Sequence, residues 1–404
     1  MPVKMLDGNG AAVEAIRLVR PGVIAAYPIT PQSSIAEHLS DEVAAGRINA
    51  QYVRVESEHS AMSVCVGAQL TGVRAATATS SVGLALMHEV CGVTSGCRIP
   101  LVMPVVNRSL VAPWSLWCDH QDTMAERDTG WLQFYAGTVQ DILDLYLAAM
   151  RISEHPDVLT PSMVCLDGFF LSHSMQKVIV PEDQDAFDFV GEYNKYANMY
   201  LDPKDPMFVN DLTPTNEYTE MRYQQMVGFQ EAKRVAPEVF AEFKEKFGRE
   251  LAAVKPYLLD DAEVAVVTIG SMSGTARYVV NQLRAKGIKA GSLQIMMFRP
   301  FPAEEIRAAL AHVPVVGVMD RSAGLGGILP PVCAEVVDAL YGTGCDVRSY
   351  IGGLAGRDIS NHSFEKIFQE LLEIRQGSRK DHSQWFDVQD DPMNIRIEVR
   401  EEGV

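Results

Sequence analysis

The sequence predicts an α/β protein: a doubly wound parallel-sheet domain followed by a second, smaller α/β domain. Short apolar runs alternate with helical periods over the first 180 residues, and the same alternation restarts near residue 262. Strands that alternate with helices need crossover connections, which make neighbouring strands parallel and cover both faces of the sheet. A chain of 404 residues is long enough for two domains with separate cores.

The elements of the first domain follow in chain order. Residues 22–27 (GVIAAY) form an apolar strand that ends at the turn-forming Pro28 and Pro31. The later expected strands are 51–55, 74–79, 101–106 and 163–166, and the expected helices are 32–42, 58–72, 84–93 and 139–153. Each of these helices has an apolar face that can pack on a sheet.

The middle of the chain interrupts this alternation. Residues 181–216 have no clear period and are expected to run over the surface or over a partner, and residues 217–257 form a charged helical connector. The second domain then has expected strands at 262–269, 290–297 and 313–319 and helices at 275–286 and 303–311. We place the domains at 1–240 and 258–376. The polar tail at 377–404 is either disordered or in contact with partner subunits.

Composition excludes several functional classes. The 35 basic and 52 acidic residues give a formal charge of −17, which disfavours binding to nucleic acid and to anionic membranes. No apolar run reaches the roughly 20 residues of a membrane span, and no signal peptide precedes the first strand. The seven cysteines form no Cys-x-x-Cys unit, so we expect no zinc or iron–sulfur ligation by this chain and a reducing cytoplasm around it.

The loop after the first apolar run is the sharpest local feature. Two prolines stiffen the sequence YPITP and fix the direction of the Thr30 hydroxyl at the carboxyl end of a strand, where open parallel sheets bind ligands. A plain proline-capped turn explains the same residues, because loops at strand ends are common.

Two further strand ends carry charged residues. Glu58 begins a helix, where a carboxylate either compensates the helix dipole or, if buried, shares a proton with a ligand nitrogen. Asn107 and Arg108 follow a buried strand, and the planar fork of an arginine there matches a carboxylate. A solvated surface arginine is the competing interpretation of Arg108.

Weaker features surround these residues. The loop Asp119-His120-Gln121-Asp122 hints at a metal site, although polar loops produce such clusters often. Trp114, Trp117 and Trp131 either wall a pocket or pack the edge of a core. The glycine-rich segments 324–327 and 352–358 either cradle a phosphate or form tight turns.

Taken in order, these motifs resemble one family. They are YPITP, ESEHSA, VNRSL, the DHQD loop, DTGW, DGF, FRPFP and GGLAGRDIS. Together they are similar to the α subunit of the 2-oxoacid:acceptor oxidoreductases, of the pyruvate:ferredoxin type. The resemblance runs from about residue 6 to about residue 375.

This resemblance implies a thiamine-diphosphate enzyme built from several subunits. The α subunit supplies the domain that holds the aminopyrimidine ring and a domain like the carboxyl-terminal domain of transketolase. The resemblance implies that a β subunit holds the diphosphate and magnesium, and the absence of a Gly-Asp-Gly signature from this sequence agrees with it. A γ subunit and a ferredoxin-like subunit with iron–sulfur clusters complete the complex, with a flavin- and NAD-linked subunit in some members. Coenzyme A takes the acyl group, and no metal is ligated by this chain.

The resemblance also assigns roles residue by residue. Glu58 matches the glutamate that hydrogen-bonds the aminopyrimidine ring, and Pro28, Ile29 and Thr30 match the loop at the cofactor. Thr30 and Arg108 match the residues that bind the substrate carboxylate, and Asn107 borders the same pocket. A threonine in place of a second arginine favours a 2-oxo monocarboxylate, either pyruvate or a bulkier acid such as phenylglyoxylate.

Two other functional classes compete with this hypothesis. A subunit like transketolase or the dehydrogenase E1 component would use the same cofactor with partners that lack iron–sulfur clusters. A non-catalytic scaffold would retain the pocket without using it, and turnover of its complex would then not depend on Glu58.

Overall fold

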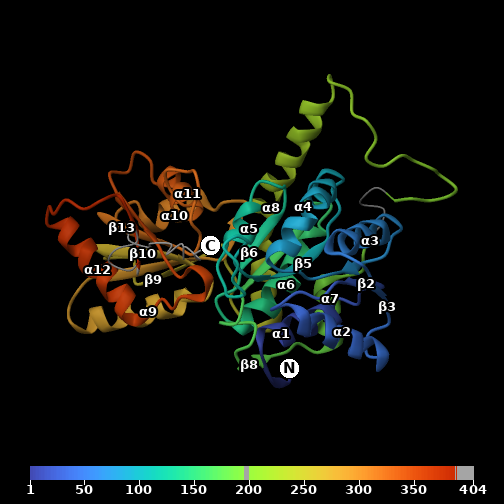
Figure 1. The fold of residues 1–404 in the computed structure, drawn as a ribbon, viewed down its shortest axis with the longest axis horizontal. Helices are drawn as coiled ribbons and strands as arrows, with labels where there is room; N and C mark the ends of the chain where they lie inside the picture. The colour runs from blue at the N-terminus through green and yellow to red at the C-terminus, as the bar shows by residue number, and fades with distance from the viewer. Residues whose placement is uncertain (195–199, 387, 389–404) are drawn as a thin grey trace, which may run out of the picture.

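The computed structural model describes residues 1–194, 200–386 and 388. Figure 1 shows two α/β domains side by side, with the first domain from blue to green and the second from yellow to red. The alternation of strands and helices predicted from the sequence is confirmed in both domains. No helix in the described ranges is long and apolar enough to cross a bilayer.

The first domain contains a central sheet with helices on both faces. Its strands are β1 (Val3–Leu6), β2 (Val23–Ala26), β3 (Gln51–Arg54), β4 (Ala75–Ala76), β5 (Val102–Asn107), β6 (Leu132–Tyr135), β7 (Ser162–Asp167) and β8 (Gln176–Ile179). Its helices are α1 (Gly8–Leu18), α2 (Ser33–Ala44), α3 (Glu58–Leu70), α4 (Ser81–Gly96), α5 (Gln121–Ala125), α6 (Val139–Ser153), α7 (Asp183–Val190) and α8 (Tyr218–Phe247).

The strands of the first domain form two parallel groups. The group β3-β2-β4 and the group β6-β7-β5 are joined where Thr79 bridges Val105. The strand β12 (Met297–Arg299) comes from the second half of the chain but pairs antiparallel with β6. Helices α1 and α6 pack together on one face of the sheet, whereas α3 and α4 pack together on the other. The fully buried apolar side chains of α6 lie at the centre of the first core.

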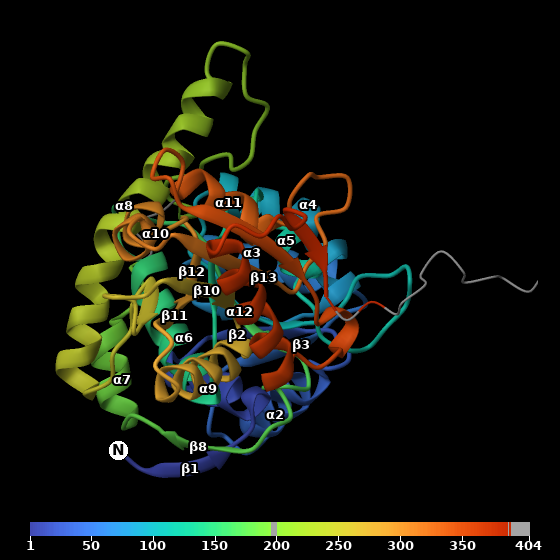
Figure 2. The ribbon, with the colours of Figure 1, turned by 90° about the vertical axis from the view of Figure 1, so that its left-hand side faces the viewer.

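The second domain is a six-stranded sheet in the order β15-β14-β13-β10-β11-β9. Its strands are β9 (Val254–Tyr257), β10 (Val264–Ile269), β11 (Ala290–Ile295), β13 (Val315–Asp320), β14 (Asp346–Ile351) and β15 (Ser383–Trp385). Its helices are α9 (Met272–Ala285), α10 (Ala303–Leu310), α11 (Pro331–Ala339) and α12 (Asn361–Arg375), with a 3-10 turn at Leu354–Gly356. Helices α9 and α12 cover one face, as Figure 2 shows, and α10 and α11 cover the other.

The start of the polar tail joins this sheet. β15 pairs parallel with β14, and the Phe386 amide donates to the Ile351 carbonyl at 2.6 Å. Residues 383–385 therefore extend the sheet of their own chain. Phe386 packs against a buried apolar cluster, and the Lys366 Nζ atom lies 5.9 Å from the centroid of its ring. The expected contact of the tail with partner subunits stays a prediction. Residues 387 and 389–404 lie outside the described residues.

An arm projects from the first domain. It consists of residues 200–217 and the first turns of α8, and Figures 1 and 2 show it extending beyond the rest of the molecule. Several of its apolar side chains face solvent, with Phe208 90% and Leu212 93% exposed, and Met221 and Tyr223 also exposed. The remaining turns of α8 pack on α6 through buried residues such as Phe240 and Phe243. Within the expected surface excursion at 181–216, residues 183–190 form α7 and residues 195–199 lie outside the described residues, so the excursion as a whole stays a prediction.

Candidate active site

The carboxyl ends of five strands meet along one edge of the first domain. Strands β2, β3, β4, β5 and β7 run parallel, so the loops that follow them lie on the same side of the sheet. The sequence motifs at Thr30, Glu58 and Arg108 all begin in these loops or at the helices that follow them. We therefore take this edge as the candidate active site.

The loop after β2 is held from inside the domain. The amide nitrogen of Asn9, which is fully buried on α1, donates to the Pro31 carbonyl at 2.8 Å and to the Ser34 hydroxyl at 2.7 Å. The Gln32 amide donates to the Ile29 carbonyl at 2.7 Å and closes the turn. Pro28 and Thr30 are exposed and Ile29 is half-buried, so the loop presents these residues to whatever occupies the edge.

Glu58 lies at the first position of α3 and is only 6% exposed. Its helix is capped by Ser57, whose hydroxyl accepts a hydrogen bond from the Ser60 amide. A side chain on Gly83 would come within 2.6 Å of both the Glu58 Oε1 and the Thr79 Oγ1 atoms. The Thr79 hydroxyl is fully buried and has no hydrogen-bond partner among the described residues. Glu58, Thr79 and Gly83 thus form a small polar cradle whose floor is a residue without a side chain.

Arg108 is buried beside the proline-rich loop. It is 5% exposed, its Nη1 donates to the Thr30 carbonyl at 2.7 Å, and its Nε has no partner within the described chain. Burial lowers the pKa of this guanidinium from its ordinary value, but the group remains positive at neutral pH. The structure brings Thr30 and Arg108 into contact, although they are 78 residues apart in the sequence. A buried cation with a free donor is suited to binding a carboxylate.

Short hydrogen bonds join the cradle to the Arg108 loop. The Ser80 hydroxyl donates to the Val106 carbonyl at 2.6 Å, and the Ser81 hydroxyl donates to the Ser109 carbonyl at 2.5 Å. The segment that contains Thr79 and Gly83 therefore lies against the segment that contains Arg108. Two of the predicted functional positions, Glu58 and Arg108, belong to one continuous surface.

The side-chain amide nitrogen of Asn107 points away from this surface. It is fully buried, and its amide nitrogen donates to the Asp122 Oδ1 at 2.9 Å and to the Thr123 Oγ1 at 2.8 Å. These bonds hold the Arg108 loop against α5. The role of Asn107 in binding substrate stays a prediction.

The three tryptophans divide between core and surface. Trp131 is fully buried and its indole donates to the Cys91 carbonyl, so it packs in the core. Trp114 and Trp117 are 74% and 54% exposed in a loop that returns to the Arg108 segment, where the Ser109 amide donates to the Trp117 carbonyl at 3.1 Å. The Trp117 ring lies 4.4 Å from the Phe169 ring. The side chains of Trp114 and Trp117 thus lie beside the candidate site.

A buried charged cluster fastens the second domain to the same edge. Asp167, at the end of β7, accepts hydrogen bonds from the His120 Nε2 and from the Arg321 Nη1, each at 2.7 Å, and from the Ser271 hydroxyl. Burial alone would raise the pKa of Asp167, but His120 and Arg321 outweigh it and hold that pKa below its ordinary range. Arg321 and Ser271 come from the second domain, so the cluster joins the two domains.

The same cluster contains His120, one of the residues that suggested a metal site in the sequence. Cys118, His120 and Asp167 have ligand atoms within 4.8 Å of one another and are all buried. However, the Arg321 guanidinium already lies among them, 2.7 Å from the Asp167 Oδ2 and 3.8 Å from the Cys118 sulfur. A second cation at this point would be repelled by the first. The DHQD loop is therefore used here for contact between domains.

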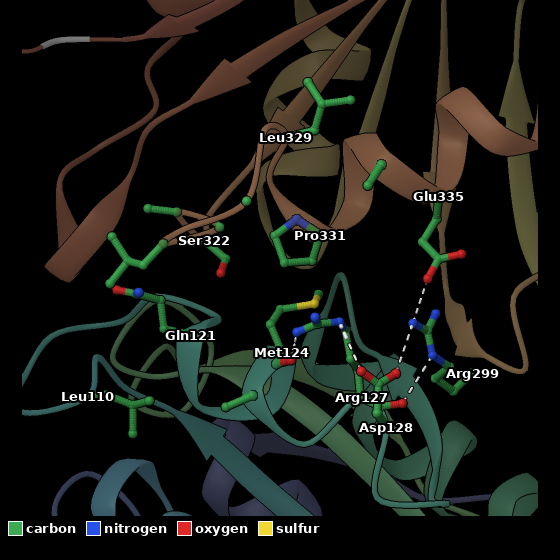
Figure 3. A pocket seen from close by; sticks show the side chains of 16 residues that line it. Leu110, Gln121, Met124, Arg127, Asp128, Arg299, Ser322, Leu329, Pro331 and Glu335 are labelled. Carbon is green, nitrogen blue, oxygen red and sulfur yellow. Dashed lines mark hydrogen bonds and ion pairs between the residues drawn. The ribbon is translucent and has the colours of Figure 1, made fainter.

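A cavity of about 510 Å³ lies between the domains, behind the Arg108 loop. Figure 3 shows Met124, Arg127 and Asp128 of the first domain facing Ser322, Leu329 and Pro331 of the second. Arg299 pairs with Glu335 at 2.5 Å and with Asp128 at 3.9 Å across it. Glycine-rich segment 324–327 lines this cavity, whereas segment 352–358 touches the first domain, where the Gly356 amide donates to the Cys118 carbonyl. Because its charges are already paired, the cavity is a weaker candidate for a reacting site.

Sequence reasoning missed the cradle around Glu58. The segment Ser80-Ser81-Val82-Gly83 is interpreted from sequence as a plain turn, and Thr79 as the end of a strand. The available signal is the run of small, mostly polar residues from Thr77 to Gly83, which directly follows β4 and continues into the first turn of α4. Such a run leaves room for a ligand to approach the backbone closely.

Comparison with known proteins gives two matching family models. Residues 14–241 match the thiamine-diphosphate-binding model of pyruvate flavodoxin/ferredoxin oxidoreductase. Residues 262–364 match core domain II of pyruvate:ferredoxin oxidoreductase. The two matched ranges correspond to the two α/β domains described above.

Two curated relatives cover most of the chain. The pyruvate synthase subunit PorA of Methanothermobacter thermautotrophicus is 44% identical over 370 residues, covering 91% of this chain and 94% of its own. The alpha subunit of the NADH-dependent phenylglyoxylate dehydrogenase of Aromatoleum evansii is 41% identical over 385 residues, covering 93% and 92%.

One solved structure supports the fold. The 2-oxoglutarate:ferredoxin oxidoreductase of Magnetococcus marinus superposes with a TM-score of 0.71 at 18% identity, covering 93% of this chain and 65% of that longer chain. At this level of identity the likeness concerns the fold alone.

Proposed function

The chain belongs to the pyruvate flavodoxin/ferredoxin oxidoreductase family, and on that premise we propose that it is the α subunit of a thiamine-dependent 2-oxoacid oxidoreductase. The proposed reaction converts a 2-oxo monocarboxylic acid and coenzyme A into an acyl-CoA, carbon dioxide and a proton. Two electrons leave in the same reaction. In this proposal they pass to iron–sulfur clusters on partner subunits and from there to ferredoxin or NAD. The observation that carries the proposal is the contact of the Glu58 cradle with the Arg108 loop along one strand-end edge.

The cradle has the chemistry that an aminopyrimidine ring requires. A buried carboxylate at Glu58 would share a proton with a ring nitrogen, and the unpartnered Thr79 hydroxyl offers a second polar contact. Because Gly83 has no side chain, the Glu58 Oε1 and Thr79 Oγ1 atoms can both lie against its backbone, where a Cβ atom would come within 2.6 Å of each. Thiamine diphosphate, when bound, supplies the carbon nucleophile and the electron sink for decarboxylation. No magnesium or diphosphate site is assigned to this chain, so we infer that a β subunit supplies both.

Arg108 and Thr30 account for substrate binding in this proposal. The guanidinium of Arg108 would hold the substrate carboxylate, while its bond to the Thr30 carbonyl keeps the proline-rich loop at the same place. Burial of Arg108 strengthens its attraction for an anion, since little water screens it. The Thr30 hydroxyl, in the same loop, would bond the second oxygen or the keto group. One arginine in this position suits a monocarboxylate.

A bulkier acid such as phenylglyoxylate is the second candidate substrate. The exposed Trp114 and Trp117 stand beside the Arg108 segment and would offer aromatic contacts to a phenyl ring. A relative named as a phenylglyoxylate dehydrogenase subunit is nearly as similar as one named as a pyruvate synthase subunit.

A substrate panel on the native complex tests the proposal. The complex is purified with its partner subunits and assayed with pyruvate, 2-oxoglutarate, 2-oxoisovalerate, phenylglyoxylate and oxalate, in the presence of coenzyme A and a viologen dye. We expect a brown complex that reduces the dye with one or more of the monocarboxylates. A colourless complex that transfers acyl groups without reducing the dye would support the transketolase-like or E1-like alternative.

A further inference from the structure

Asp122 is a buried carboxylate at which three segments meet, its own helix α5 and two segments of the candidate site. It is 1% exposed and lies at the start of α5. Its Oδ1 accepts the Asn107 side-chain amide at 2.9 Å and the Thr123 backbone amide at 2.8 Å. Its Oδ2 accepts the backbone amides of Arg108 and Ser81, each at 3.0 Å. All four of these partners are N–H groups, so their dipoles stabilise the negative charge of the Asp122 carboxylate.

A carboxylate in this position carries an energetic cost. Burial raises the pKa of Asp122, and the bonds from Asn107, Arg108, Ser81 and Thr123 work in the opposite direction. Each of these bonds to an ionised group is stronger than a bond between neutral partners. The carboxylate is therefore stable only while all three segments remain in place around it, which fixes them relative to one another.

Each of the segments held by Asp122 belongs to the candidate site. Arg108 is the residue that contacts the Thr30 loop, and its backbone amide is one of the four donors. Ser81 lies between Thr79 and Gly83 of the cradle. The backbone of Ser81 has a φ of 50°, a left-handed conformation that is unfavourable for a residue with a side chain and needs external support. The bond to Asp122, together with the bond from its hydroxyl to Ser109, supplies that support.

We propose that Asp122 is a positioning residue that fixes the Arg108 guanidinium relative to the Glu58–Thr79–Gly83 cradle. The inference rests on the proposed function, because it assigns the cradle to the cofactor and Arg108 to the substrate carboxylate. Asp122 does not touch either ligand in this proposal. It acts through the two backbone amides that share its Oδ2 atom. The distance between the two binding groups then depends on this buried side chain together with the hydrogen bonds from the Ser80 and Ser81 hydroxyls.

The variant Asp122→Asn tests this role with little change in volume. A carboxamide has one oxygen, so its NH2 group must face either the Asn107–Thr123 pair or the Arg108–Ser81 pair of donors. We expect the substrate KM of the assembled complex to rise about tenfold, since a displaced clamp loses part of a charge-assisted bond. We also expect the affinity for oxamate, an unreactive 2-oxoacid analogue, to fall by the same factor in calorimetry.

Asp320→Asn is the matched control. Asp320 is also fully buried at a strand end, and its two oxygens accept the Val332 and Cys333 amides at 2.9 and 3.0 Å in the second domain. This variant should lower the melting temperature and leave both KM and oxamate affinity within twofold of the wild type. If Asp122→Asn behaves like Asp320→Asn, its role is merely structural and the inference is overturned.

A double-mutant cycle tests whether Asp122 affects oxamate binding through Arg108. In an Arg108→Ala background, Asp122→Asn should change oxamate affinity by less than twofold, because the group it positions is absent. An undiminished tenfold loss in that background contradicts positioning through Arg108. Should Asp122→Asn fail to assemble, Asn107→Ala removes one of the four donors, and we expect a threefold weaker oxamate affinity. No weakening there would also overturn the inference.

The binding readout separates this inference from the proposed function. A wild-type complex that binds oxamate but turns over no 2-oxoacid refutes the proposed reaction, and the Asp122 comparison still decides the positioning role. An active complex whose oxamate affinity is unaffected by Asp122→Asn refutes the positioning role alone. A complex that neither binds oxamate nor turns over substrate refutes both.

Discussion

Each domain has an edge at which its parallel strands end, and the two edges have different roles. In the first domain this edge carries buried polar atoms without partners in the described chain, among them the Thr77 and Thr79 hydroxyls and the Arg108 Nε. In the second domain the corresponding edge reaches across to the first, through Ser271 and Arg321. Arg321 of the second domain also has an Nε atom that is unpaired among the described residues, but its Nη1 donates to Asp167 of the first domain, so this edge joins two domains. The α/β architecture alone therefore does not indicate which edge binds a ligand.

Removing the guanidinium that joins the domains should produce the largest effect. Arg321→Met leaves the buried Asp167 carboxylate without its guanidinium partner, so we expect a loss of about 3–5 kcal/mol in the free energy of unfolding. Urea denaturation measures this loss. The control Arg375→Met removes a half-exposed partner of Glu263 and should cost less than about 1 kcal/mol. Equal losses from the two variants would show that the second-domain edge does not fasten the domains.

Removing the carboxylate of the first-domain edge should chiefly affect turnover. We expect Glu58→Ala to reduce turnover of the assembled complex about 100-fold or more, the scale for losing a proton-transfer partner. Glu56→Ala, two residues earlier, removes an exposed carboxylate that bonds only the Ser60 hydroxyl and serves as the control. If turnover of the Glu58 variant matches that of the control, the cradle is vestigial and the chain is a scaffold.

Removing the cation of the same edge should affect substrate binding. Arg108→Ala is expected to raise the substrate KM about tenfold with a smaller change in kcat, because it removes a charge-assisted contact present in the ground state. Steady-state kinetics of the complex measure the two constants separately. Arg47→Ala removes an exposed arginine paired with Glu42 and should leave both constants unchanged. An unaltered KM in the Arg108 variant would remove Arg108 from the substrate site.

The smallest expected effect concerns pH and the second domain. Burial raises the pKa of Asp320 to about 7, against the bonds from the Val332 and Cys333 amides. The folded state then binds more protons than the unfolded state between about pH 4 and pH 7, so the stability due to this group is complete below pH 4 and disappears as pH rises through 7. We expect wild type to lose about 1 kcal/mol relative to Asp320→Asn between about pH 6 and pH 8.

Thermal melts at both pH values measure that difference. A gap between the two proteins that stays constant with pH would mean that Asp320 is already ionised in the folded state. In that case its two backbone donors would outweigh its burial.

The fold was largely predictable from local patterns. The alternation of apolar runs and helical periods placed most strands and helices, including the helix at 139–153, whose observed bounds are the same. Pairings between distant segments were not predictable, because no local pattern encodes them. The strand β12, which follows β11 in sequence, pairs with β6 of the first domain, and β15 adds the start of the polar tail to the second sheet.

The site divides in the same way. Thr30, Glu58 and Arg108 could be chosen from sequence, because each is a chemically distinctive residue at the end of a strand. Thr79 and Gly83 could not be chosen from sequence, because their place in the candidate site depends only on their closeness to Glu58. The composition of the loop at Asp119–Asp122 suggested a metal site. In the structure, His120 joins the two domains, and the Asp122 carboxylate accepts hydrogen bonds from the loops of the candidate site. The burial and the partner of each residue decide its role, and both depend on tertiary structure.

The exposed arm has a consequence for producing the protein. Phe208, Leu212, Met221 and Tyr223 present apolar surface to water on a segment that stands away from the body. Surfaces of this kind promote aggregation when a chain is made without whatever normally covers them. A preparation expressed alone should therefore self-associate as its concentration rises, and replacing Phe208 and Leu212 with serine should yield a better-behaved sample for crystallisation or single-particle imaging.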